Sequence, residues 1–318
     1  MGGAISACFL GSALLSNTIT KSLFHIALSR NGIKKIEQIP FLRKAVSGFL
    51  PDREFMGALK EGARALMGAG AKEVHYSAKD GLPLIGHWLP AKNPKRVIIA
   101  MHGWRSHWAR DFGMIAPFWQ RQGCSVLFAE QRGQGKSGGD CMGFGATERH
   151  DCLSWCEWVN RQNKEGLPIY LAGISMGAAT VLMAAGLGLP ENVHGIIADC
   201  GFTSPHEIWK HVAENNLHLR YHLRGYHADH LFQKKLKFAA NTFSTIDAMH
   251  QNKIPTLLIH GQADHFVPLE MSLQNFDACT APKHLLIVPK ADHGMSYYLD
   301  PEGYQRIMVK FFMDYDEK

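Results

Sequence analysis

The sequence predicts an α/β fold in which a mostly parallel sheet is covered by helices on both faces. From residue 72 onward, short apolar segments alternate with longer helical patterns, as in parallel strands joined by helical crossovers. Several of the apolar runs are unbroken, which is typical of strands buried on both faces. The chain has 318 residues, so it can bury a full-sized core in one large domain or two small ones.

The composition of the chain argues against a nucleic-acid partner and against a bound metal. The net charge of +6 is mild, and the Lys and Arg residues are scattered rather than gathered in a stripe. We therefore expect no nucleic-acid partner. The seven cysteines have no paired rhythm and no zinc-ligand spacing, so reduced cysteines that pack in the interior are expected, with no bound metal and no cofactor.

Residues 1–70 are expected to form an N-terminal helical segment. Residues 1–20 carry no charge, and a membrane-associated helix over 4–20 is one interpretation, although the stretch is marginal for a membrane span. A soluble helix that packs on the protein is the other, so localisation stays open between cytoplasmic and membrane-associated. Residues 21–70 show amphipathic helical patterns interrupted by Pro40 and Pro51.

Residues 71–318 are expected to form the main α/β domain. Its expected elements, in order, are a hairpin (72–78 and 84–89), a buried strand (96–101), a helix (112–122), a strand (125–130), a Trp-rich helix (144–163), four strands (168–173, 193–199, 255–260 and 284–289) and a closing helix (301–315). An insertion over about 204–250 lacks a convincing strand and is predicted to be a helical cap. It is rich in histidine, but only His218 and His222 have helical i, i+4 spacing, and no carboxylate pattern accompanies them. This favours a solvated cap over a metal site.

The chain is organised around a G-x-S-x-G motif, Gly173 to Gly177, which lies between an apolar strand and a helix of small residues. In this context the motif predicts a nucleophile elbow, a sharp turn that exposes the Ser175 hydroxyl above the sheet edge. Side chains two positions before and after the serine would collide with the strand and the helix, and glycine removes them. Ser175 is therefore the candidate nucleophile.

A serine hydroxyl needs a general base and an acid that orients the base. On this fold the acid precedes the histidine, and Asp264 and His293 each follow a predicted late strand. Asp199 ends an earlier strand and is the rival acid. His260, His265 and Asp292 are poorer candidates, because His260 lies within a strand and the other two adjoin the favoured residues.

An oxyanion hole needs two amide donors. One is expected to be the N–H of Met176, which follows the nucleophile, and the other the N–H of Trp104 in the loop His102-Gly103-Trp104-Arg105. Trp104 and Met176 are also the expected substrate-binding residues, with the Trp104 indole walling an acyl pocket. His102 is expected to brace this loop rather than to take part in catalysis.

These motifs resemble the α/β-hydrolase-fold serine hydrolases, in particular the bacterial lysophospholipase-like and serine-aminopeptidase-like branch. The resemblance runs from about residue 72 to 315 and rests on H-G-W (102–104), Q-R-G-Q-G-K-S (131–137), G-I-S-M-G (173–177), H-G-Q-A-D (260–264) and D-H-G (292–294). In one departure, Glu130 stands where the family usually has an aspartate. The resemblance implies that this position is structural.

The leading hypothesis is a serine hydrolase that cleaves small-molecule carboxylic esters through an acyl-enzyme. A serine peptidase or amidase with the same triad is the alternative, although residues 204–250 show no acidic cluster to anchor a substrate amine. A non-catalytic binding protein would lack a member of the triad, and none is lacking. Every catalytic motif lies after residue 100, so removing residues 1–30 is expected to leave catalysis intact if they are an anchor or an appendage. The sequence predicts neither the acyl-chain length nor the oligomeric state.

Overall fold

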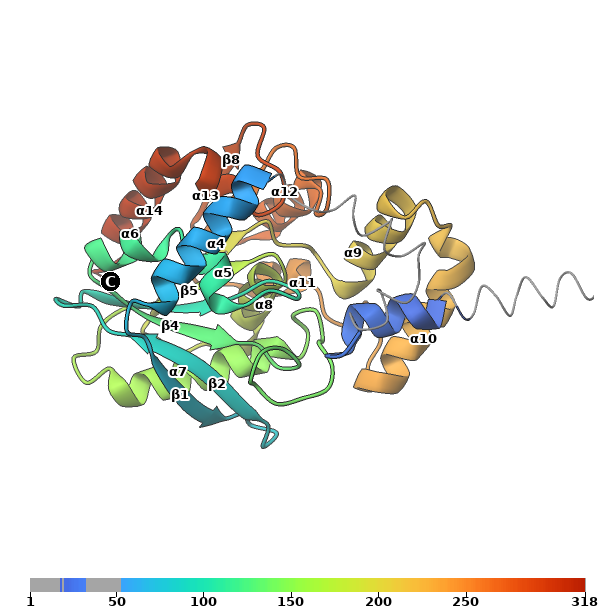
Figure 1. Ribbon diagram of the computed structural model, residues 1–318, viewed down its shortest axis with the longest axis horizontal. Coiled ribbons are helices and arrows are strands. Elements are labelled where there is room, and N and C mark those ends of the chain that lie inside the picture. Colours follow the sequence, from blue (N-terminus) through green and yellow to red (C-terminus); the bar gives the residue numbers. More distant parts are fainter. Residues whose placement is uncertain (1–17, 19, 33–52, 318) are drawn as a thin grey trace, which may run out of the picture.

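The computed structural model describes residues 18, 20–32 and 53–317. One eight-stranded sheet lies between two layers of helices (Figure 1), which confirms the predicted α/β fold. The strands are β1 (Lys72–Ser77), β2 (Pro83–Leu89), β3 (Arg96–Met101), β4 (Cys124–Glu130), β5 (Ile169–Ile174), β6 (Val193–Asp199), β7 (Thr256–Gly261) and β8 (Lys283–Val288). The helices are α4 (Arg53–Met67), α5 (Trp108–Phe112), α6 (Ala116–Arg121), α7 (Glu148–Gln162), α8 (Met176–Ala184), η1 (Ala185–Leu187), α9 (Pro205–His211), η2 (Val212–Asn216), α10 (Tyr221–Leu236), α11 (Thr245–Gln251), α12 (Leu269–Ala278), α13 (Ser296–Leu299) and α14 (Pro301–Tyr315).

The strand order in the sheet is β1-β2-β4-β3-β5-β6-β7-β8. The β1–β2 and β2–β4 pairs are antiparallel, and every later pair is parallel. The carboxyl ends of β3, β5, β6, β7 and β8 therefore meet at one edge of the sheet. In open α/β sheets this is the edge where ligands bind.

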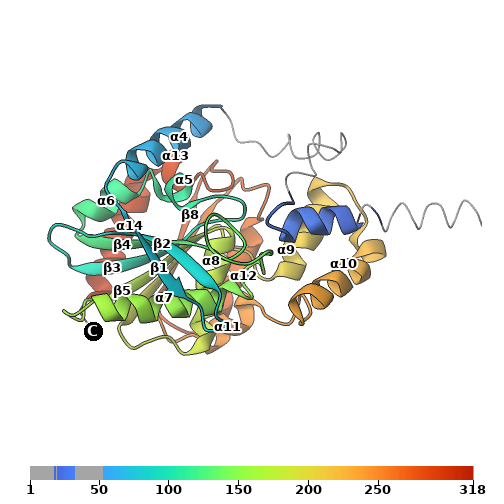
Figure 2. The same cartoon turned by 60° about the horizontal axis from the view of Figure 1, so that its bottom comes forward.

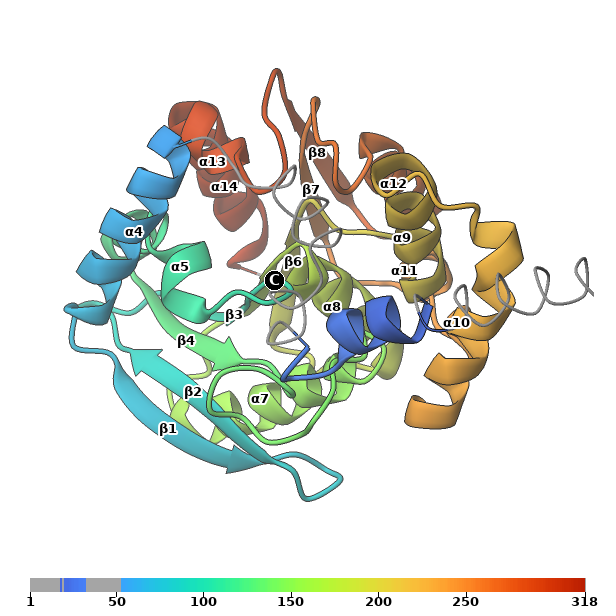
Figure 3. The ribbon, with the colours of Figure 1, turned by 45° about the vertical axis from the view of Figure 1, so that its right-hand side comes forward.

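The core has two layers because side chains alternate across the sheet. On one face, Ile99 of β3 packs in a cluster with residues of α7, α8, α11 and α12, including Trp155 and Val181. On the other face, Ile98 packs with residues of α4, α5, α6 and α14, including Trp119. Figure 3 shows α4, α5 and α14 on one side of the sheet and α7 on the other.

Two expected helices differ from the structure. The single helix expected over 112–122 is wrong, because Gly113 ends α5 and a new helix, α6, starts with Pro117 near its N-terminus. A Cβ on Gly113 would lie 2.3 Å from the carbonyl carbon of Gly62 in α4, so the lack of a side chain at Gly113 lets the chain approach α4 closely. The helix expected from residue 144 starts at Glu148, because Phe144 and Gly145 have left-handed φ angles of 54° and 90°.

The insertion between β6 and β7 is helical throughout its regular elements, in α9, η2, α10 and α11. Helices α9 and α10 project beyond the sheet, whereas Met249 of α11 packs in the core beneath α8 (Figures 1 and 2). A further helix at residues 20–28 lies beside α9 and α10. The membrane-associated helix expected over 4–20 lies outside the described residues except for Thr18 and Thr20. Within the described ranges, no helix has the length and apolarity that crossing a bilayer requires.

Candidate active site

Ser175 lies in the turn between β5 and α8. Its backbone has φ 56° and ψ −116°, a conformation that L-residues rarely adopt. The flanking glycines allow this turn: a Cβ on Gly177 would lie 1.8 Å from the Met101 carbonyl oxygen, and one on Gly173 would lie 2.2 Å from the Gly177 oxygen. The Ser175 N–H donates to the Asp199 carbonyl oxygen at 2.8 Å, which ties the turn to β6. The local sequence thus produces a strained turn that fixes one hydroxyl at the sheet edge.

The structure brings Ser175, His293 and Asp264 together. Ser175 Oγ lies 2.9 Å from Nε2 of His293, and Nδ1 of the same ring lies 2.8 Å from Oδ2 of Asp264. The three residues follow β5, β8 and β7, whose carboxyl ends share one edge of the sheet. The arrangement is a continuous hydrogen-bonded relay from a hydroxyl through an imidazole to a carboxylate.

Asp264 is held by its own loop and by β7. Its Oδ1 accepts hydrogen bonds from the Phe266 and Val267 amides at 2.9 and 2.8 Å, and His260 Nε2 lies 3.3 Å from Oδ2. Burial alone would raise the pKa of this carboxyl. The His293 charge and the hydrogen bonds from His260 and His293 outweigh burial and hold the pKa well below its usual range. Asp264 is therefore an ionised, fixed acceptor for the His293 ring.

His293 has a raised pKa. Burial disfavours its charged form, but the Asp264 carboxylate, through its charge and its hydrogen bond to the ring, raises the pKa well above the ordinary value of 6.5. Cys200, which sequence reasoning did not single out, follows β6 with φ 49° and is fully buried. Burial raises the pKa of its thiol to about 11, so it stays protonated beside the ring. The signal in the sequence was its position directly after the strand-ending Asp199.

The rival residues have other partners. Asp199 Oδ1 accepts from Ser296 Oγ at 3.1 Å, and burial raises the pKa of Asp199 to about 6. His265 is exposed and lies 3.5 Å from Asp292. Asp292 accepts from the backbone amides of His265 and His293 at 3.0 and 2.7 Å. None of these side chains takes the place of Asp264 beside the His293 ring.

The Trp104 and Met176 amides flank Ser175. Within the described part of the chain, neither N–H donates to a protein acceptor. A Cβ on Gly103 would lie 3.4 Å from the Ser175 Cβ, so the loop before Trp104 runs close to the nucleophile. Both amides lie in the segments expected to supply the oxyanion donors.

The loop that carries Trp104 is braced on several sides. The Gly103 N–H donates to Asp111 Oδ2 at 2.7 Å, and the Arg105 N–H donates to Gln134 Oε1 at 2.6 Å. His102 is fully buried, which lowers the pKa of its ring, and its Nδ1 lies 2.8 Å from the Gly103 oxygen. This is the bracing contact expected for His102.

An apolar cluster fills the space between these two amides and the cap. It includes Met176, Phe144 and Phe202, with Trp104 and Trp209 packed against it. Phe144 lies 6.3 Å from Trp104 and 5.2 Å from Trp209, measured between ring centroids. The side chains packed next to Met176, the residue after the nucleophile, are therefore mostly apolar.

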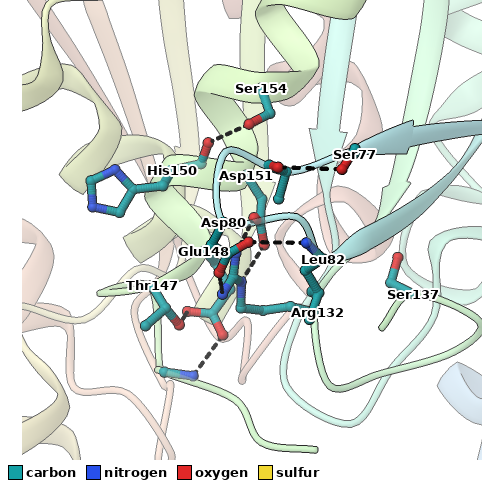
Figure 4. Close-up of polar contacts among 12 residues, drawn as sticks. Ser77, Asp80, Leu82, Arg132, Ser137, Thr147, Glu148, His150, Asp151 and Ser154 are labelled. Carbon is teal, nitrogen blue, oxygen red and sulfur yellow. Dashed lines mark hydrogen bonds and ion pairs between the residues drawn. The ribbon is translucent and has the colours of Figure 1, made fainter. Parts of the chain in front are cut away.

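Buried charges hold the loops that surround this cluster. Glu148 accepts from the Gly143 and Gly145 amides at 2.6 and 2.9 Å, which fixes the turn bearing Phe144 (Figure 4). Arg132 pairs with Asp151 at 2.6 Å and with Asp80 at 2.8 Å. Through these contacts, Glu148 and Arg132 hold the loops near the site in place.

Glu130 is also structural in its contacts. Its Oε1 lies 2.7 Å from Nε2 of buried His87, and its Oε2 accepts from the Lys136 amide. The departure from aspartate is accommodated by these partners.

One cluster of side chains of metal-ligating type lies in the described residues. The group of three ligand-type side chains found there is Cys200, Asp264 and His293, which is the hydrogen-bonded relay itself. In the cap, His206 contacts Asp229 at 3.3 Å and His211 lies 3.0 Å from the Asn215 amide. His206 and His211 therefore each have a protein partner within the cap.

Comparisons with known proteins agree with the architecture. Residues 92–223 match the family model described as serine aminopeptidase, S33. The uncharacterized protein YfhR of Escherichia coli (strain K12) is 28% identical over 251 residues, covering 76% of this chain and 81% of that protein. The uncharacterized protein YqkD of Bacillus subtilis (strain 168) is 27% identical over 230 residues, covering 71% and 73%.

Among solved structures, the Pyrococcus furiosus esterase Pf2001 superposes with a TM-score of 0.63 at 20% identity, over 79% of this chain and 93% of that one. The acylaminoacyl peptidase of Pyrococcus horikoshii superposes with a TM-score of 0.58 at 18% identity, over 78% of this chain and 42% of that one. The chain therefore has the α/β-hydrolase fold.

Proposed function

We propose that the chain hydrolyses carboxylic esters through an acyl-enzyme formed on Ser175. The observation that carries the proposal is the relay of 2.9 and 2.8 Å hydrogen bonds that joins Ser175, His293 and Asp264. A serine with this pair of partners is activated as a nucleophile, because the imidazole accepts its proton and the carboxylate stabilises the imidazolium.

In the first half-reaction, Ser175 Oγ attacks the ester carbonyl carbon and its proton passes to His293 Nε2. The Trp104 and Met176 amides donate to the oxyanion of the tetrahedral intermediate. Collapse of the intermediate breaks the carbon–oxygen bond to the leaving alcohol, which takes the proton from His293. Water then attacks the acyl-enzyme by the same route, releasing the carboxylic acid and restoring Ser175.

Esters are favoured over peptides by the surroundings of the relay. The apolar cluster around Phe144 suits an acyl group, whereas an aminopeptidase needs a carboxylate for the substrate's amine. In the described cap, Asp229 contacts both His206 and Tyr221 and so has partners of its own. The acylaminoacyl peptidase among the structural neighbours makes amide substrates the alternative to test.

A substrate panel separates the two activities. We expect p-nitrophenyl esters of graded acyl length to be cleaved with higher kcat/KM than aminoacyl and N-acylaminoacyl p-nitroanilides. Ser175→Ala should abolish both activities, whereas Ser154→Ala should not, since Ser154 is a buried serine that donates to the His150 oxygen within α7. Faster cleavage of the anilides would overturn the ester assignment.

A further inference from the structure

The helix at residues 20–28 and the turn at 29–32 are attached to the loops of the candidate site. The Arg30 N–H donates to the Asp140 oxygen at 2.9 Å, and the Met142 N–H donates to the Leu28 oxygen at 2.8 Å. Leu28 is 1% exposed and packs in the same apolar cluster as Met176. The sequence assigned these residues to a separate N-terminal segment, whereas the structure joins them to the loops around Ser175.

Arg105 makes the most direct of these connections. Its Nε donates to the Ile26 oxygen at 3.1 Å and its Nη2 to the Ser29 oxygen at 2.7 Å. Nη2 also donates to the Ile26 oxygen. These carbonyls lie at the C-terminal end of the helix, where unpaired oxygens and the helix dipole favour a cation.

The guanidinium is otherwise poorly compensated. Among the described residues, Arg105 forms no ion pair with a carboxylate, and burial lowers its pKa to about 10. Burying a charge costs free energy unless the charge is paired and hydrogen-bonded. The carbonyl oxygens of the helix are therefore the groups that hold this guanidinium in place. The backbone of Arg105 has φ 51°, a strained conformation that persists only where its surroundings hold it.

Trp104 is tied to the same helix. Its indole Nε1 donates to the Ala27 oxygen at 2.8 Å. The side chains of the adjacent residues Trp104 and Arg105 thus both donate hydrogen bonds to backbone carbonyl oxygens of this helix and the turn that follows it. The amide of Trp104 is the expected oxyanion donor, so the helix holds the peptide unit whose orientation matters most for that role.

We propose that residues 20–32, acting through Arg105, are a positioning element of the oxyanion hole. The inference rests on the proposed ester hydrolysis and adds a non-local support to it. The Arg105 guanidinium and the Trp104 indole together anchor residues 104–105 to the helix, and this anchoring holds the Trp104 N–H in place. A released loop would still bind substrate, but the donor would be misaligned with the oxyanion of the transition state. The proposal replaces the expectation that removing residues 1–30, as an anchor or an appendage, leaves catalysis intact.

The test is Arg105→Met in the full-length chain, with Arg110→Met as the matched control. Arg110 lies five residues further on, and its side chain contacts only the Met56 sulfur among the hydrogen-bonding partners in the described ranges. Loss of a whole oxyanion donor costs about 10²–10³ in kcat, so misalignment should lower kcat by about 10- to 100-fold. KM should change little, and Arg105→Lys should be intermediate. Affinity for a trifluoromethyl ketone, whose adduct places an oxyanion in the hole, should fall by the same factor as kcat.

A second variant perturbs the contact from the opposite side. A Cβ on Gly32 would lie 2.6 Å from Arg105 Nη2 and 2.5 Å from the His25 oxygen, so Gly32→Ala should displace the guanidinium and reproduce the loss of kcat. The double variant should lose no more than the worse single variant, because both act on one contact. If Arg105→Met does not fold, the kcat of Gly32→Ala still tests whether residues 20–32 position the oxyanion hole.

Unchanged kcat in folded Arg105→Met or Gly32→Ala would overturn the proposal. So would a raised KM with unchanged affinity for the trifluoromethyl ketone, since that pattern indicates only a pocket wall. A wild-type chain that neither turns over esters nor reacts with a fluorophosphonate would refute the proposed function itself. An active wild type with an insensitive Arg105→Met would refute only the positioning role.

Discussion

Replacing Asp264 with asparagine tests the orientation of the His293 ring. Oδ1 of Asp264 accepts from two backbone amides, so the substituted amide is expected to keep its oxygen there. Its NH₂ group then faces His293 Nδ1, where the carboxylate oxygen lies at 2.8 Å in the native chain. The NH₂ donates to Nδ1 and forces the ring proton onto Nε2. A ring protonated at Nε2 cannot accept the Ser175 proton.

Because this tautomer cannot accept the Ser175 proton, we expect turnover to fall. In serine proteases the equivalent change lowers turnover by about 10⁴-fold, or about 5.4 kcal/mol in transition-state free energy. Asp199→Asn is the control, because an amide oxygen can still accept from Ser296 Oγ and Asp199 does not contact the His293 ring. Its turnover should stay close to that of the wild type.

The assay is kcat for a p-nitrophenyl ester at neutral pH, with circular dichroism to verify that each variant is folded. The acid limb of kcat/KM reports the same interaction, since Asp264 stabilises the charged ring and raises its pKa. Wild-type-like turnover in Asp264→Asn together with collapse in Asp199→Asn would refute the assignment of the acid.

Three further predictions concern the pH profile, the elbow and the core. The acid limb of wild-type kcat/KM should lie above pH 6.5, because the neutral His293 ring is the active base and its pKa is raised; a limb at or below pH 6.5 would contradict the proposed pairing. Gly177→Ala should abolish folding or activity, since its Cβ would lie 1.8 Å from the Met101 oxygen, and an active, folded variant would disprove the clash. Asp316→Ala should lower the free energy of unfolding by about 3 kcal/mol in urea denaturation, because it leaves the buried Arg96 guanidinium without its carboxylate; a change near zero would show that the pair is not needed.

The strand positions were predictable because the pattern of apolar residues within each segment indicates how deeply that segment is buried. Unbroken apolar runs such as 96–101 become strands that are buried on both faces. The three candidate catalytic side chains follow from this, because residues after successive parallel strands arrive at one edge. Ser175 was named from the G-x-S-x-G motif, and Asp264 and His293 from their order in the chain and their positions after strands. The structure places the three within hydrogen-bond distance.

Features that depend on contacts between distant segments were not predictable. The break between α5 and α6 reflects a close approach of Gly113 to Gly62, which no local pattern reveals. The attachment of residues 20–32 to the Trp104 loop uses backbone carbonyls, which every sequence contains and which therefore leave no signature. Cys200 reaches the His293 ring from the end of β6, a proximity that exists only once the sheet is assembled.

The central claim is that Ser175 is the nucleophile, and covalent labelling tests it most directly. A fluorophosphonate probe should label the wild-type chain covalently. The fraction of chain that is labelled should equal the fraction of ester turnover that is lost. Ser175→Ala should show neither labelling nor turnover while retaining the wild-type circular dichroism spectrum, and Ser154→Ala should be labelled as the wild type is. Labelling that persists in folded Ser175→Ala would contradict the claim.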